Sequence, residues 1–241
     1  MKYTKRNLLP PLLARDKKDS GKEAIQDFFL AWTLRCAAYE HRLADYMVYE
    51  YARRIVYVLI HGDHAYDSDH FEEVEAEGKI KKINWRNRYR VNGSFKFTEP
   101  PADFVVTSVT TYRQEDNIDL HAEVVVENNG IYILNIENKF YSGIRKGQLE
   151  SAKAYLKNKY QSLKVDKFIN LVIHCDETNI FGQNKKGEAE ALRNRCRNAG
   201  YKFPDIYTIA LLAGMREGRE NMLTGNDLFD EYWFRGYESI E

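Results

Sequence analysis

Hydrophobic positions in the first quarter of the chain repeat at helical spacing. Residues 22–60 contain neither proline nor glycine, and they predict two helices, roughly 22–36 and 40–60, with a break near Cys36–Tyr39. The expected inner faces carry Ile25, Phe28, Phe29 and Trp32 in the first helix and Leu43, Tyr46, Met47, Tyr51 and Ile55 in the second. Residues 1–20 are polar and basic and contain Pro10-Pro11, which predicts an irregular N-terminal arm.

The remainder of the chain changes from β-type to mixed patterns. Runs of β-branched and apolar residues predict strands over about 105–112, 120–126, 131–140, 168–174 and 206–213. Helical spacing predicts further helices over about 146–160, 187–199 and 228–234. Two helices, then antiparallel strands, then alternating helices and strands predict an α/β fold with a mixed sheet flanked by helices. We expect one domain over 1–241.

The clearest turn signal is Asn128-Asn129-Gly130, between two predicted strands. A three-residue hairpin loop that ends in glycine is favoured, because glycine accepts the left-handed conformation of the bulge. With that loop, counting outward along both strands places Asp119 opposite Lys139 and His121 opposite Glu137. The hairpin therefore predicts ionisable groups at one end of the strand pair.

Alternation along these two strands separates an apolar face from a polar one. The polar face carries Asp119, His121, Glu123, Asn135, Glu137 and Lys139. Carboxylates on neighbouring strands, such as Asp119 and Glu137, can share a divalent cation with waters and a phosphate oxygen, as Mg²⁺ prefers. A bound metal lowers the pKa of its water. The Lys139 ammonium can orient that water and stabilise developing negative charge. This pattern predicts a phosphodiesterase site.

Asp119, the hairpin and the tripeptide Glu137-Asn138-Lys139 together resemble the signature of the PD-(D/E)XK nucleases. The resemblance is to the bacterial and phage branch in which the strand reads Ile-Glu-Asn-Lys. A helix beginning with Gln-Leu follows there, as Gln148-Leu149 does here. The resemblance covers about 112–160 and, more loosely, 20–60. It implies a restriction-endonuclease-like fold, with the two N-terminal helices on one side of a central mixed sheet and helix 146–160 on the other.

The resemblance also implies a function and roles for residues. The expected activity is Mg²⁺- or Mn²⁺-dependent hydrolysis of nucleic acid, DNA rather than RNA, in a setting such as prokaryotic or phage defence. Asp119 and Glu137 would bind the metal. Lys139 would act on the water and the transition state, and Gln148 would position a water or a phosphate.

Two positions of the metal site stay open at this point. The first helix of this branch often supplies a further acidic residue, for which Glu23 is the candidate, with Asp27 or Glu40 as substitutes. The branch also often has arginine two residues before the aspartate, where this chain has Asn117. That departure leaves Asp116 as an alternative first carboxylate.

A basic and aromatic segment at 79–97 follows a cluster of glutamates at 72–77. Cations meet phosphates and aromatic rings stack on bases, so this segment is a candidate nucleic-acid surface. The alternative is a hairpin with a solvated charged face. The candidate contacts, including two lysines of the predicted helix 146–160, are Lys82, Arg86, Arg88, Arg90, Lys146 and Lys153.

Composition narrows the class of protein. Thirty-six basic residues balance thirty-six acidic ones among 241, which argues against a module that binds nucleic acid through phosphate contacts alone. No apolar run is long enough to span a bilayer, and three cysteines without CxxC spacing favour a reducing, cytosolic compartment rather than a membrane.

Cutting two strands together would require a homodimer or repeated binding. The alternatives are a catalytically idle relative that binds nucleic acid or a protein partner, and an enzyme acting on RNA or a small phosphodiester.

Overall fold

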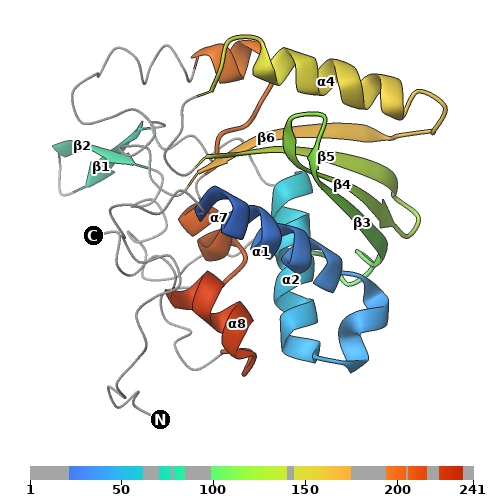
Figure 1. The fold of residues 1–241 in the computed structure, drawn as a ribbon. Helices are drawn as coiled ribbons and strands as arrows, with labels where there is room; N and C mark the ends of the chain where they lie inside the picture. The colour runs from blue at the N-terminus through green and yellow to red at the C-terminus, as the bar shows by residue number, and fades with distance from the viewer. Residues whose placement is uncertain are drawn as a thin grey trace.

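A four-stranded mixed sheet forms the centre of the described chain (Figure 1). The computed structural model describes residues 22–61, 71–76, 79–84, 99–139, 144–174, 194–204, 206–215 and 223–235, so the predicted arm at 1–20 lies outside it. The strand order is β3-β4-β5-β6, with bounds Val106–Glu115, Ile118–Val126, Gly130–Lys139 and Lys167–His174. β3, β4 and β5 are antiparallel, whereas β5 and β6 are parallel. α4 (Gln148–Lys159) connects the parallel pair, which confirms the predicted mixed sheet.

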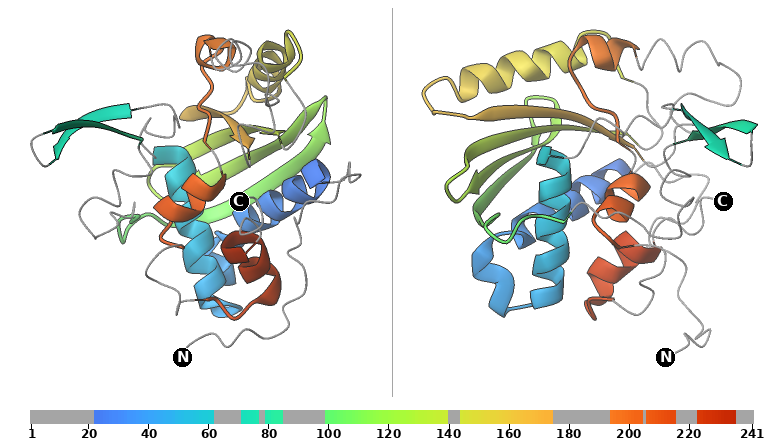
Figure 2. Two further views of the ribbon diagram at one scale, coloured as in Figure 1. Left: turned by 90° about the vertical axis from the view of Figure 1, so that its left-hand side faces the viewer. Right: turned by 180° about the vertical axis from the view of Figure 1, so that it is seen from behind.

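Helices cover both faces of the sheet (Figures 1 and 2). α4 lies over one face, as predicted, beside a short helical segment at 194–198. The other face packs against an all-helical layer of α1 (Lys22–Cys36), η1 (Tyr39–Leu43), α2 (Tyr46–His61), α7 (Ile206–Leu212), α8 (Asp227–Asp230) and the π-helical turn η3 (Glu231–Arg235). None of the described helices is long and apolar enough to cross a membrane.

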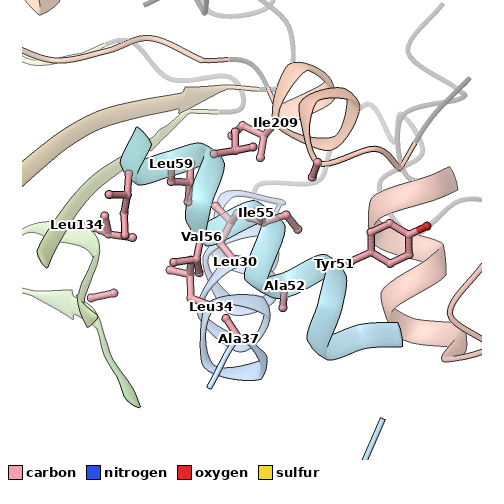
Figure 3. Close-up of a cluster of buried hydrophobic side chains, with 14 of the residues drawn as sticks. Leu30, Leu34, Ala37, Tyr51, Ala52, Ile55, Val56, Leu59, Leu134 and Ile209 are labelled. Carbon is pink, nitrogen blue, oxygen red and sulfur yellow. The ribbon is translucent and has the colours of Figure 1, made fainter. Parts of the chain in front are cut away.

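The main core lies between the sheet and this helical layer (Figure 3). Leu134 from β5 and Leu59 from α2 both belong to this cluster, together with Leu30, Leu34 and Ile55. All are almost inaccessible to solvent. Because burial of apolar surface is the main force that drives folding, this cluster fixes α1 and α2 against the sheet.

The predicted inner faces of the first two helices are partly wrong. Phe28 is 48% exposed, Leu43 87% and Tyr46 61%. α1 instead turns the polar residues Gln26 and Asp27 inward, where they are almost completely buried. Hydrophobicity alone could not reveal this orientation, because it depends on hydrogen-bond partners on a distant strand.

The predicted strand over 206–213 is also wrong, since α7 is a helix. Ile206, Ile209 and Ala210 of α7, and Ala213 just after it, are inaccessible to solvent, and these positions recur at spacings of three and four. A short, wholly apolar run fits a buried strand and a buried helix equally well. The helix predicted at 228–234 is confirmed by α8 and η3, and 194–198, the described part of the segment predicted at 187–199, is helical.

The hairpin between β4 and β5 forms, but in a different register from the predicted one. Val126 pairs with Gly130, so the predicted pairing is off by one residue in each strand. Together the two errors shift each residue's predicted partner by two positions. Because side chains alternate with a period of two, the same residues still share the polar face. Continuing the observed pairing one step beyond its last pair sets Asp119 opposite Glu137, not opposite Lys139. The two candidate metal ligands are therefore closer in register than the sequence predicted.

Gly130, the glycine of this hairpin, is expected to tolerate substitution poorly. Its φ is +89°, and a Cβ atom there would collide with the Asp166 carboxylate, which accepts the Ile131 backbone N–H at 2.7 Å. Gly130→Ala should lower the free energy of unfolding by about 2–3 kcal/mol, measured by urea denaturation. Gly225→Ala is the control: φ is +83° but the space is open, so about 1 kcal/mol is expected. Equal losses in both variants would contradict the predicted collision.

Candidate active site

Four of the predicted residues come together on the α4 side of the sheet, where β4 begins and β5 ends. Glu137 and Lys139 project from the same face of β5, because the residue between them, Asn138, points to the opposite face. Asp119 stands beside them on β4, and Gln148 is the first residue of α4.

Direct contacts join these four side chains. Lys139 Nζ forms an ion pair with Glu137 Oε1 and lies 3.7 Å from Asp119 Oδ2. Gln148 Nε2 donates a hydrogen bond to Glu137 Oε1 at 2.6 Å. The Gln148 carbonyl oxygen accepts the backbone N–H of Arg145 at 3.1 Å, which fixes the orientation of the amide. Asp119, Glu137, Lys139 and Gln148 thus form one connected cluster.

The cluster is largely shielded from solvent and contains two carboxylates that repel each other. The Glu137 side chain is only 3% exposed, whereas that of Asp119 is 21% exposed and gives access from outside. Burial, and then the Asp119 charge, raises the pKa of Glu137 from 4.5 to about 8, although Lys139 acts in the opposite direction. A carboxyl group with so high a pKa beside a second acid and a lysine is typical of functional sites.

Comparison with known proteins identifies the family. A family model described as the PD-(D/E)XK nuclease superfamily matches residues 29–232, which is most of the chain. The chain belongs to this superfamily. No curated protein and no solved structure matches it significantly. The match confirms the superfamily inferred from the Asp119, Glu137 and Lys139 pattern, and the mixed sheet between helical layers is consistent with its restriction-endonuclease-like α/β fold.

PD-(D/E)XK nucleases use divalent metals, and the geometry of the Asp119 and Glu137 pair fits one. Among the described residues no group of three or more potential metal ligands occurs, so the site offers two carboxylates. Mg²⁺ needs no more, since it retains several waters and commonly binds through one or two carboxylates and a substrate phosphate. A cation between these carboxylates would also offset the repulsion that raises the pKa of Glu137.

The Glu137 carboxyl group should make the stability of the metal-free protein depend on pH. Its pKa is higher in the folded protein than in the unfolded chain, so folding strengthens proton binding. The resulting stability is complete below 4.5 and is lost as pH rises through about 8. In thermal scans with EDTA we expect Tm to fall between about pH 5 and 8, and to fall less in Glu137→Gln. Parallel pH profiles for the two proteins would contradict this expectation.

The alternatives for the metal site are placed as follows. Asp116 is exposed in the β3–β4 turn, whereas Asp119 contacts the cluster, which favours Asp119 as the first carboxylate. Asp27 accepts a hydrogen bond from Asn138 Nδ2, on the face of the sheet opposite to the cluster. Glu40 lies in η1 and pairs with His41. Glu23 belongs to the first turn of α1, but its side chain is outside the described part, so its role stays a prediction.

His121 is a buried neighbour of the cluster. Its ring stacks on Tyr112 with centroids 4.6 Å apart, and its Nε2 lies 3.3 Å from Lys159 Nζ. Burial, and then the Lys159 charge, lowers the pKa of His121 to about 4, so the ring is neutral at pH 7. A neutral and fully buried imidazole is suited to packing between the sheet and the end of α4, not to contact with substrate.

Contacts that the sequence did not reveal attach the second half of α4 to the sheet. Glu115 of β3 accepts hydrogen bonds from Tyr155 Oη at 2.6 Å and from Lys159 Nζ at 2.7 Å. Gln148 makes the corresponding contact at the other end of the helix. Both ends of α4 are therefore held, and with them the position of Gln148 over Glu137. The sequence offers one signal for them, since Tyr155 follows Gln148 by seven residues, or about two turns of a helix.

Three of the six candidate nucleic-acid contacts lie within the described residues. Lys146 is exposed in the turn before α4, near the cluster, while Lys153 donates to the Ala199 carbonyl at 2.6 Å. Lys82 lies in β2 (Lys79–Asn84), which pairs with β1 (Phe71–Ala76) in the hairpin anticipated as the alternative. The remaining candidates, Arg86, Arg88 and Arg90, lie outside the described residues.

Proposed function

We propose that this protein is a Mg²⁺- or Mn²⁺-dependent nuclease that hydrolyses phosphodiester bonds, with DNA as its substrate. The observation that carries the proposal is the convergence of Asp119, Glu137 and Lys139 on one face of neighbouring strands, within a chain of the PD-(D/E)XK superfamily. Asp119 and Glu137 are the proposed metal ligands, and Glu23 is a candidate third. A defence role in a prokaryote or phage, and a single domain over the whole chain, belong to the same proposal.

Each residue of the cluster has a chemical task in this proposal. Asp119 is oriented by the Asn138 backbone N–H, which donates to its Oδ2 at 2.8 Å, so one carboxylate oxygen has a fixed direction. Glu137 is oriented by Gln148 in the same way. A divalent cation bound by these carboxylates supplies Lewis-acid activation of water and neutralises charge on the phosphate.

Lys139 provides the positive charge that belongs to the protein itself. Its ammonium pairs with Glu137 and lies 3.7 Å from Asp119, and its side chain is only 6% exposed. In such a poorly solvated place a fixed charge stabilises developing negative charge more strongly than in water. Lys139 is thus placed to hold the attacking water or a phosphate oxygen.

The experiment is a cleavage panel on plasmid, linear double-stranded DNA, single-stranded DNA and RNA with Mg²⁺, Mn²⁺ or EDTA. We expect metal-dependent cleavage of DNA that Asp119→Asn abolishes. Glu123→Gln, further along the same face of β4, is the matched control and should cut like the wild type. Cleavage of RNA but not of DNA would show that the substrate is RNA instead of DNA. The absence of cleavage of any polymer by the wild type would overturn the proposal in favour of a catalytically idle binding protein.

A further inference from the structure

A buried polar network lies behind the candidate active site, on the opposite face of β5. Asn138 is inaccessible to solvent. Its Oδ1 accepts a hydrogen bond from Gln26 Nε2, and its Nδ2 donates to Asp27 Oδ1 at 2.7 Å. Asp27 Oδ2 in turn accepts from Gln114 Nε2 of β3 at 2.8 Å. One amide in the middle of the Glu137-Asn138-Lys139 tripeptide therefore connects β5 to α1.

This network stands within an otherwise apolar layer. The preceding residues on the same face of β5, Leu134 and Ile136, belong to the main hydrophobic core. Burying an amide and a carboxylate among such residues is costly unless their hydrogen bonds are made, and the bonds require one relative position of helix and strand. The polar pairs therefore define how α1 sits against the end of β5.

The same residue reaches the active-site face through its backbone. The Asn138 N–H donates to Asp119 Oδ2 at 2.8 Å, while Glu137 and Lys139 are its neighbours in the chain. A displacement of the Asn138 backbone would change the direction of the Asp119 carboxylate and the spacing of all three side chains. The Asn138 side chain bonds to α1 on one face of the sheet, and its backbone N–H bonds to Asp119 on the active-site side. Both sets of bonds restrain the position of this one residue.

We propose that Asn138, anchored by Gln26 and Asp27 of α1, is a positioning residue that holds Asp119 and Glu137 at the spacing needed to share a cation. This inference rests on the proposed function of the site. The Asn138 side chain is buried on the far face of β5, so it acts on the site through the backbone. Residues behind metal ligands commonly change metal affinity or activity by about 10–100-fold when substituted.

A reciprocal exchange of amide and carboxylate tests the inference. Asn138→Asp alone sets a second carboxylate against Asp27 and removes the donor between them. The double variant Asn138→Asp with Asp27→Asn restores a donor and an acceptor, because the amide introduced at position 27 can donate to the new carboxylate and still accept from Gln114. Mn²⁺ affinity is measured by electron paramagnetic resonance, together with kcat and KM on DNA. Thermal unfolding confirms that each variant is folded.

We expect the single variant to lose about 10–100-fold in Mn²⁺ affinity and in kcat, with KM for DNA unchanged, and the double variant to recover to within about threefold of wild type. Wild-type values for the single variant, or a folded double variant no better than the single, would overturn the inference. A wild type that binds Mn²⁺ but cuts nothing would defeat the proposed function alone, since the Mn²⁺ affinities would still decide the role of Asn138. A wild type that binds no Mn²⁺ would overturn both.

Discussion

Replacing Lys139 with methionine is expected to lower kcat for nucleic-acid cleavage by about 10²–10³-fold, the usual cost of removing one fixed group that stabilises transition-state charge. Methionine keeps the length and the apolar stem of the side chain, so packing at this buried position is largely retained. The change therefore removes the ammonium that pairs with Glu137 and lies 3.7 Å from Asp119. Single-turnover cleavage at saturating metal isolates this effect from substrate binding.

Loss of Lys139 should also alter the metal-free protein. Two neighbouring carboxylates without their counter-ion repel more strongly, so the apparent affinity for Mn²⁺ should rise or stay constant as kcat falls. Lys157→Met, at an exposed position on α4, is the control and should leave cleavage unchanged. Cleavage by Lys139→Met at the wild-type rate would show that the lysine serves only as a structural counter-ion.

Replacing Trp233 with alanine is expected to lower the free energy of unfolding by about 3–5 kcal/mol, the range for truncating a fully buried aromatic side chain. Trp233 lies in η3, is inaccessible to solvent and packs edge-on against Tyr232 with ring centroids 5.1 Å apart. Its Nε1 donates to Thr33 Oγ1 of α1 at 2.9 Å. The C-terminal helices are thus attached to the helix that carries Gln26 and Asp27. Urea unfolding followed by fluorescence and circular dichroism gives the change.

Two further variants separate packing from hydrogen bonding at this position. Thr33→Val should cost only about 1–2 kcal/mol, because it removes the acceptor and leaves the Trp233 ring in place. Phe229→Ala, which removes another fully buried ring of the same cluster, should approach the loss in Trp233→Ala. A loss below about 1 kcal/mol for Trp233→Ala would mean that the C-terminal segment does not contribute to the core as described.

The candidate site was predictable because it depends on alternation more than on register. Asp119, Glu137 and Lys139 occupy odd positions on two neighbouring strands, and an error of one residue in each strand leaves them on one face. The register itself was not predictable from a glycine. The left-handed backbone occurs at Asn128 (φ 59°) as well as at Gly130. The sequence alone does not show which residues form the turn and which form the first pair of the strands.

Features that depend on distant partners could not be predicted. The inward orientation of Gln26 and Asp27 follows from Asn138, which lies more than a hundred residues later in the chain. An argument from hydrophobic spacing assigns polar residues to the solvent side, so it predicted an inner face of the first helix that included Phe28 instead. The attachment of α4 through Glu115 has the same character, since its partners Tyr155 and Lys159 are some forty residues away.

The most direct test of the central claim compares wild type with Glu137→Gln in one experiment, with Mn²⁺ binding and DNA cleavage measured on the same preparations. The account predicts that the wild type binds Mn²⁺ and cuts DNA, and that EDTA stops the cutting. It also predicts that the folded Glu137→Gln protein binds Mn²⁺ much more weakly and does not cut, because one of two metal-binding carboxylates has become an amide. Cleavage by Glu137→Gln at the wild-type rate would contradict the account and place the active site elsewhere in the chain.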